Sequence, residues 1–172
     1  MIRINRAPVL TLWAAVVAER LGFDWDAALT LGKAVAGLNA QAKGQRLGIF
    51  EPGEKKREQA GERPAGEEYW VELLGRSVPV VNTPAGVRAT AKGRPVDPRS
   101  VQHYLDGKFG DALAEVRRAM EELAAAFSPE DLEEQAYRLY EKFRPQIPAG
   151  KQGWGAKGEL DLDRIRALAK ES

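Results

Sequence analysis

The N-terminal part of the chain alternates apolar and polar positions at helical spacing. After "IRIN", which predicts a short strand, apolar residues recur on one side of a helix over residues 10–21. They are Leu12, Trp13, Val16, Val17 and Leu21. Gly22 follows at a position where glycine often ends a helix, and Asp24 is a good N-cap for a second helix that reaches about residue 42. The pattern predicts two consecutive helices joined by a short turn.

Residues 18–32 have the outline of a helix-turn-helix. Such a motif needs small residues where its helices meet and a glycine in the turn. Ala18 precedes Gly22 by four positions, and Ala28 and Leu31 fall where the second helix would face the first. The N-terminal part is therefore predicted to be helix-turn-helix-like.

The start of the second helix lacks the chemistry of a DNA-reading helix. Asp24 and Asp26 would face the phosphates, and no Arg, Asn or Gln is placed for bidentate contacts with bases. Trp25 and Leu29 favour burial instead. We therefore expect Trp25, like Trp13, in the core or an interface, which makes Trp25 a candidate partner-binding residue.

The strongest strand pattern lies in the middle of the chain. Residues 69–81 and 86–93 flank "NTPAG", whose Asn, Pro and Gly are typical of a turn, and together they predict one central β-hairpin. Pro79 has no backbone N–H, so the first strand is expected at an edge or a bulge. Asp97 followed by Pro98 predicts the start of another helix.

Two apolar stripes predict a C-terminal pair of helices over residues 111–127 and 129–143. The first stripe is Leu113, Val116, Met120, Leu123 and Phe127, and the second is Leu132, Ala136, Leu139, Tyr140 and Phe143. Ser128 is the expected N-cap of the second helix. The two helices are expected to pack as an antiparallel pair. A Pro- and Gly-rich loop and a short amphipathic helix over residues 162–169 complete the chain.

Residues 51–68 differ from the rest, because charges alternate with Gly and Pro and no apolar side chain exceeds alanine or proline in size. This composition predicts a solvated, flexible loop. It separates a helical part, residues 1–50, from a hairpin-and-helix part, residues 69–172. A chain of 172 residues can bury one core. We therefore expect one compact α+β domain that is mostly α-helical.

Composition and charge exclude only a few classes of function. The formal net charge is +1, so no global field attracts nucleic acid or a membrane. The chain has no cysteine, which excludes disulfides and thiolate–metal sites and favours a cytoplasmic location. The apolar run near the N-terminus is too short for a membrane span and lacks the flanks of a signal peptide.

The charges are nevertheless segregated. Residues 75–108 contain six Lys or Arg against two Asp, a net charge of +4, whereas residues 111–143 contain nine acidic residues against four basic ones, a net charge of −5. Alternation along the second hairpin strand would place Arg88, Thr90 and Lys92 on one basic face. The candidate phosphate-binding residues are Arg76, Arg88, Lys92, Arg94 and Arg99. Equally, the basic hairpin could pair with the acidic helices, inside the molecule or across a dimer.

Candidates for catalysis and for a metal site are weak. His103 is the only histidine and lies three residues after Ser100, but no orienting acid or oxyanion hole is evident nearby. Asp161 and Asp163 are expected to cap the last helix rather than to hold Mg²⁺. No nucleotide-binding glycine motif is present. We expect no cofactor and no catalytic residue, although a small enzyme of unknown reaction stays open.

Trp154 lies between two glycines in "GKQGWGAKGE". It is expected to anchor the tail to the core. Alternatively, the loop presents Trp154 with Lys151 and Lys157 to a partner or a nucleotide, because bases stack on aromatic rings.

The segments "NRAPVLTLWAAVVAERLGFDWDAALTLGKAVAGLNA" and "GWGAKGELDLDRIRALA" together resemble conserved bacterial proteins with no assigned activity. The resemblance implies a bacterial source and transfers no site. The leading hypothesis is a non-enzymatic binding or regulatory protein that contacts a protein partner or its own copy. The alternatives are binding of a nucleic-acid backbone by the basic hairpin and a small enzyme.

Overall fold

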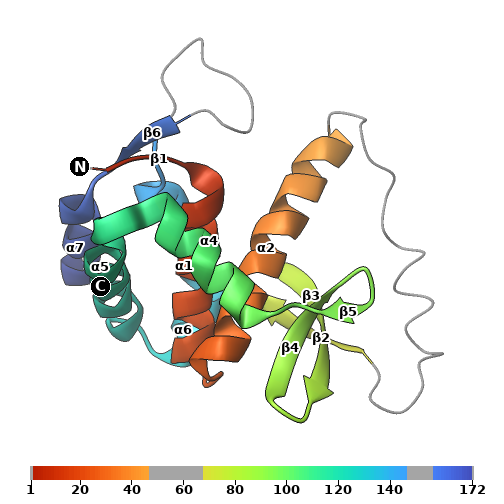
Figure 1. The fold of residues 1–172 in the computed structure, drawn as a ribbon. Coiled ribbons are helices and arrows are strands. Elements are labelled where there is room, and N and C mark those ends of the chain that lie inside the picture. Colours follow the sequence, from red (N-terminus) through yellow and green to blue (C-terminus); the bar gives the residue numbers. More distant parts are fainter. Residues whose placement is uncertain (1, 47–67, 147–156, 172) are drawn as a thin grey trace.

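The computed structural model describes residues 2–46, 68–146 and 157–171 and has the predicted α+β, mostly helical architecture (Figure 1). Its helices are α1 (Arg6–Arg20), α2 (Trp25–Arg46), α4 (Pro98–Phe109), α5 (Leu113–Ala125), α6 (Pro129–Phe143) and α7 (Leu162–Glu171), with a 3₁₀ turn at Gly110–Ala112. Its strands are β1 (Ile2–Asn5), β2 (Tyr69–Leu73), β3 (Arg76–Thr83), β4 (Gly86–Ala91), β5 (Arg94–Pro95) and β6 (Lys157–Leu160).

Helix α1 is the centre of the fold. Its eleven residues from Pro8 to Ala18 are all buried, as expected for a helix that is apolar all round. Helices α2, α4, α5 and α6 pack around it. The indole N–H of Trp13 donates to the carbonyl oxygen of Ala136 on α6 at 2.9 Å, and its ring meets that of Phe143 edge-on. Trp13 is therefore a core residue, as predicted.

The turn between α1 and α2 is closed by Gly22, as the sequence predicts. Gly22 has a φ of 118°, and the N–H of Phe23 returns to the carbonyl oxygen of Ala18, which is the hydrogen-bond pattern of a glycine-terminated helix. After this turn, α2 runs back along α1 and packs against it. A Cβ on Gly32 would lie 2.3 Å from the carbonyl oxygen of Thr11, so only glycine allows this approach.

Helix α2 lies between α1 and the four-stranded sheet (Figure 1). Six consecutive residues, 27–32, are buried there. The hydroxyl of Thr30 donates to the carbonyl oxygen of Ala27 and accepts from the N–H of Ala89 on β4 at 2.9 Å. The short strand β5 pairs with β4 only at Thr90 and Ala91, so the side chain of Thr30 provides the acceptor for the N–H of Ala89.

The sheet contains more turns than the single predicted hairpin. It is an antiparallel meander with the order β2-β3-β4-β5. The additional turns are Leu74–Gly75 and Lys92–Gly93, and all four residues have positive φ, as tight two-residue hairpin turns require. The sequence does not clearly predict the first of these turns, because leucine is unusual at a position with positive φ.

Strand β3 lies inside the sheet, so the expectation that Pro79 marks an edge strand or a bulge is wrong. Pro79 pairs with Trp70 of β2. On the other side, the pairing between β3 and β4 stops at Val80 and Ala89, one residue before Pro79. The missing N–H of Pro79 therefore falls where the ladder with β4 has already ended.

The C-terminal helices carry the predicted caps and buried stripes. Ser128 accepts from the N–H of Asp131, and the five buried residues of α6 are those that the periodicity indicates. However, α5 packs mainly on α1 and α7, and α6 mainly on α1, so the two stripes face the central helix rather than each other. Strand β6, in a region expected to be loop, pairs with β1 and joins the two ends of the described chain.

Candidate functional site

The predicted basic face of the hairpin does not form. Arg88 is only 7% exposed, and its guanidinium donates to the carbonyl oxygens of Val87 and Ala85 in its own hairpin. Thr90 is also buried and bonds to Glu68. Alternation along β4 fails as a guide to exposure because three consecutive residues, 88–90, are buried.

The other four candidate phosphate-binding residues differ in exposure and in the partners of their side chains. Arg76 is half-buried and donates to the side chain of Asn39 on α2 at 2.9 Å. Lys92 and Arg94 are exposed at the turn between β4 and β5, and neither has a charged partner in the part of the chain that the structure describes. We call Lys92–Arg94 the hairpin tip. Internal pairing of the tip with the acidic helices is therefore not observed.

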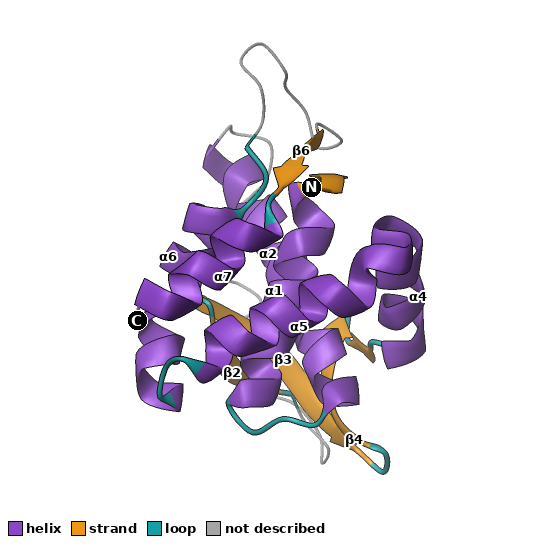
Figure 2. Ribbon diagram, turned by 90° about the vertical axis from the view of Figure 1, so that its left-hand side faces the viewer, coloured by secondary structure: helices purple, strands orange, loops and turns teal. Residues whose placement is uncertain are grey.

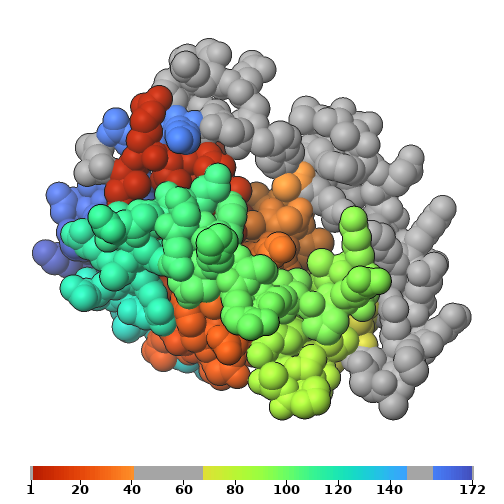
Figure 3. Space-filling view, viewed as in Figure 1, coloured from red at the N-terminus to blue at the C-terminus, as the bar shows by residue number. Residues whose placement is uncertain are grey.

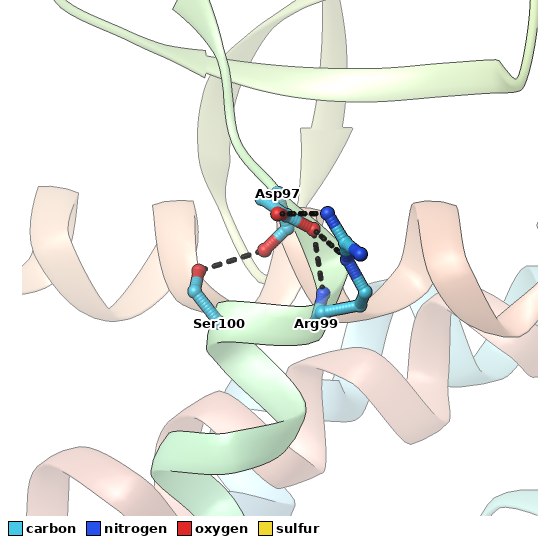
Figure 4. A network of polar contacts seen from close by, with 3 residues as sticks. All are labelled: Asp97, Arg99 and Ser100. Carbon is cyan, nitrogen blue, oxygen red and sulfur yellow. Dashed lines mark hydrogen bonds and ion pairs between the residues drawn. The ribbon is translucent and has the colours of Figure 1, made fainter.

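Arg99 belongs to a capping network at the start of α4 (Figure 4). The carboxylate of Asp97 accepts from the backbone N–H of Arg99 at 2.9 Å and pairs with its guanidinium at 3.1 Å. These hydrogen bonds hold the pKa of Asp97 below its usual range and raise the pKa of Arg99. The hydroxyl of Ser100 donates to the carbonyl oxygen of Asp97, and His103 is exposed. Ser100 and His103 are therefore not linked as a nucleophile and its base.

Trp25 is fixed at the junction of three helices. Its indole N–H donates to Gln102 on α4 at 3.3 Å, and the guanidinium carbon of Arg117 on α5 lies 3.6 Å from the centre of its ring. Arg117 in turn pairs with Glu121 at 3.1 Å and with Glu19 of α1 at 3.6 Å. A guanidinium over an indole face is a favourable cation–π contact. The half-buried ring therefore links α2, α4 and α5.

A cleft of about 540 Å³ opens beside this junction, between α4 and α5. Its apolar lining includes Trp25, Leu12, Leu105 and Leu113. Its charged lining consists of three carboxylates and two guanidiniums: Asp106, Asp111, Glu121, Arg117 and Arg118. We call it the Trp25 cleft. Its mixed apolar and charged lining makes it a candidate binding site.

The start of α2 is unsuited to entering a DNA groove. Asp24 and Asp26 are exposed, and Asp24 accepts from the N–H of Ala27 as the N-cap. The residues that follow are buried between α1 and the sheet. A helix covered on two sides cannot present its first turns to base edges.

Several expectations concern metals, membranes and the tail. Within residues 2–46, 68–146 and 157–171, no three acidic or His side chains are grouped so that they could hold a metal ion. No helix in these ranges is long and apolar enough to cross a membrane. Asp161 accepts from the N–H of Asp163 and so begins α7, as predicted. Trp154, Lys151 and nearly all of the charged loop lie outside the described residues.

The chain has no significant match among protein-family models, curated proteins or solved structures.

Sequence reasoning missed Arg117 and Gln102, which hold Trp25 in place. The spacing of Arg117 and Glu121, four apart on a helix, was a readable signal of an ion pair. The contact of Arg117 with Trp25 joins residues far apart in the sequence and has no local signal.

Proposed function

We propose that this protein is a non-enzymatic binding protein that acts through protein–protein contacts, and that the Trp25 cleft receives the hairpin tip of a second copy. The proposal rests on the presence of two features in one chain. One is an acidic, partly apolar cleft, and the other is a pair of cations that have no described partner. Both features belong to the same chain, so a second copy supplies what each lacks.

The charge balance of the cleft favours a basic occupant. Arg117 is already compensated by Glu19 and Glu121. Asp106 accepts only from the neutral amide of Gln102, and Asp111 has no charged partner among the described residues. The three carboxylates and two guanidiniums of the lining, Arg118 included, sum to a charge of −1, which a cation from outside would balance.

The hairpin tip offers such cations. Lys92 and Arg94 flank Gly93 at an exposed turn and are not engaged elsewhere in the described structure. The tip lies shortly before α4 in the chain, whereas the part of α4 that lines the cleft begins at Gln102. Figure 3 shows α4 (green) crossing one face of the molecule from the hairpin (yellow-green) towards α5 (blue-green). Two copies related by a two-fold axis could exchange tips reciprocally and close the assembly.

Sedimentation velocity on the full chain tests this proposal. The wild type should form dimers at about 50 mM salt and dissociate at about 500 mM, because screening weakens exposed charge pairs. Lys92→Gln with Arg94→Gln, and separately Asp106→Asn with Asp111→Asn, should be monomeric at both salt concentrations. The control is Glu133→Gln with Glu134→Gln on α6, which removes two exposed charges and should dimerise like the wild type. A monomeric wild type at low salt would contradict the proposal.

A second candidate function uses the same tip. Lys92, Arg94 and Arg99 are exposed within a few residues of one another and could contact the phosphates of a nucleic-acid backbone. The test is a gel shift with a duplex DNA probe over a range of salt concentrations. Binding that weakens with salt and is lost in Lys92→Gln with Arg94→Gln, together with a monomeric protein, would favour this function. Arg88 should not be mutated for this purpose, because it is buried.

A further inference from the structure

A pair of arginines lies at the opposite end of the bundle from the turn between α1 and α2. Arg6 is the first residue of α1, and Arg144 follows the last residue of α6. The Nε–H of Arg6 donates to the carbonyl oxygen of Pro145 at 2.8 Å, which holds Arg6 beside Arg144 although the two are 138 positions apart. This end also carries the pairing of β1 with β6 (Figure 2).

Neither guanidinium has a carboxylate counter-ion among the described residues. Neither Arg6 nor Arg144 forms an ion pair with a carboxylate of the described chain. The guanidinium of Arg144 lies 5.7 Å from the centre of the Tyr140 ring, and its Nε is buried without a hydrogen-bond partner. A buried N–H of a charged group without an acceptor is costly, and such an atom calls for an explanation.

The charges around Arg6 and Arg144 are mostly positive. Burial and then the charge of Arg144 lower the pKa of Arg6, and only the smaller effects of Tyr140 and Tyr137 oppose them. The first turn of α1 contains no acidic residue, so the positive end of the helix dipole is also uncompensated there. The sequence of residues 147–156, which follows directly, contains no Asp or Glu. Glu159 of β6 pairs with Gln146 through the backbone but forms no ion pair with Arg6 or Arg144, so the described residues leave both charges uncompensated.

We propose that Arg6 and Arg144 form a binding site for a phosphate group, either free phosphate or the phosphate of a small molecule. Two guanidiniums can each donate two parallel hydrogen bonds to a tetrahedral oxyanion, which a carboxylate uses less fully. The phosphate oxygens would accept from the terminal Nη–H groups of the two arginines, because the Nε of Arg6 is bonded to Pro145 and that of Arg144 is buried, and would relieve the repulsion between the two cations. The site is distinct from the Trp25 cleft and does not depend on the self-association proposed above.

Thermal unfolding of the full chain with inorganic phosphate as the probe tests this site. At constant ionic strength, replacing chloride by phosphate at ten times its dissociation constant should raise the melting temperature by roughly 3–5 °C. Acetate should give less. Arg6→Gln and Arg144→Gln should each abolish the rise, whereas Arg138→Gln, at an exposed position on α6, should keep it.

The same experiment separates binding from a structural role. In chloride alone, Arg144→Gln should melt at or above the wild-type temperature, because it removes a like charge from beside Arg6. A structural arginine would show the opposite, a lower melting temperature in both buffers. If a variant does not fold, titration of the wild type followed by NMR supplies the second readout, and the N–H signals of Arg6, Ala7 and Arg144 should shift. No phosphate-dependent rise in the wild type, or a rise that persists in both variants, would overturn the proposal.

A phosphomonoester arm distinguishes the two sources of the phosphate. Glycerol phosphate that raises the melting temperature at lower concentration than inorganic phosphate indicates the phosphate of a small molecule. Equal or weaker action indicates free phosphate. Both results support the arginine site, and its failure leaves the dimer proposal untouched.

Discussion

Gly32 shows how a single residue sets the distance between two helices. Its missing side chain lets α2 approach the backbone of α1 at Thr11 and Ala15. We expect Gly32→Ala to lower the free energy of unfolding by about 1–3 kcal/mol, because the added Cβ forces the helices apart. Gly37→Ala is the control, since a Cβ there meets nothing within 4 Å and should stabilise the helix by about 0.5–1 kcal/mol. Urea unfolding measures both, and equal effects would contradict the close approach.

Tyr140 gives a prediction about alkaline pH. The side chain is 2% exposed, and burial raises the pKa of its hydroxyl to about 12. The unfolded chain ionises this group near its ordinary pKa of about 10. Between these values the folded state holds the proton that the unfolded state has lost, so the contribution is complete below pH 10 and declines as pH rises towards 12. Tyr140→Phe should therefore lose less stability than the wild type between pH 9 and pH 11, measured by urea unfolding. Tyr69→Phe, at an exposed tyrosine, should behave like the wild type.

At single positions, the sequence predicted burial better than exposure. Trp13 and the buried residues of α6 are where the periodicity indicated. Arg88 is not, because its charge is satisfied by backbone carbonyls of its own turn, a geometry that alternation cannot reveal. Charged residues are therefore poor markers of a surface wherever a turn can supply acceptors.

At the scale of elements, Thr30 connects α2 to the sheet. Thr30→Val keeps the shape but leaves the buried N–H of Ala89 without its acceptor, which should cost about 1–3 kcal/mol. Thr11 is a matched control, because it is also buried but only donates to the carbonyl oxygen of Ala7 in its own helix. Thr11→Val should cost clearly less. Hydrogen exchange at the Ala89 amide should accelerate in Thr30→Val alone, and unchanged exchange would contradict this link.

The elements that the sequence predicted are those with local signals. Asp24, Asp97 and Ser128 cap the helices that they were expected to begin, because a cap acts within three residues. Strand β6 was missed because its partner, β1, is at the other end of the chain. The turn at Leu74–Gly75 was missed because only Gly75 is typical of such a turn, whereas Leu74 adopts a positive φ that leucine rarely has.

At the scale of the whole molecule, the net charge of +1 conceals separated charges. The sequence predicted a basic hairpin and acidic helices, and the structure shows which of these charges lack partners within the described chain. It could not predict the Trp25 cleft or the arginine pair, because both join residues that are distant in the chain and meet only through the packing around α1.

The central claim, that a hairpin tip enters the acidic cleft of another copy, is tested most directly by reversing both charges. Lys92→Glu with Arg94→Glu should be monomeric alone, and so should Asp106→Lys with Asp111→Lys, since each places like charges in contact. Sedimentation velocity of an equimolar mixture at low salt should then show a mixed dimer, because every tip again meets a cleft of opposite sign. A mixture that stays monomeric, while the wild type dimerises, would show that the copies associate through another surface.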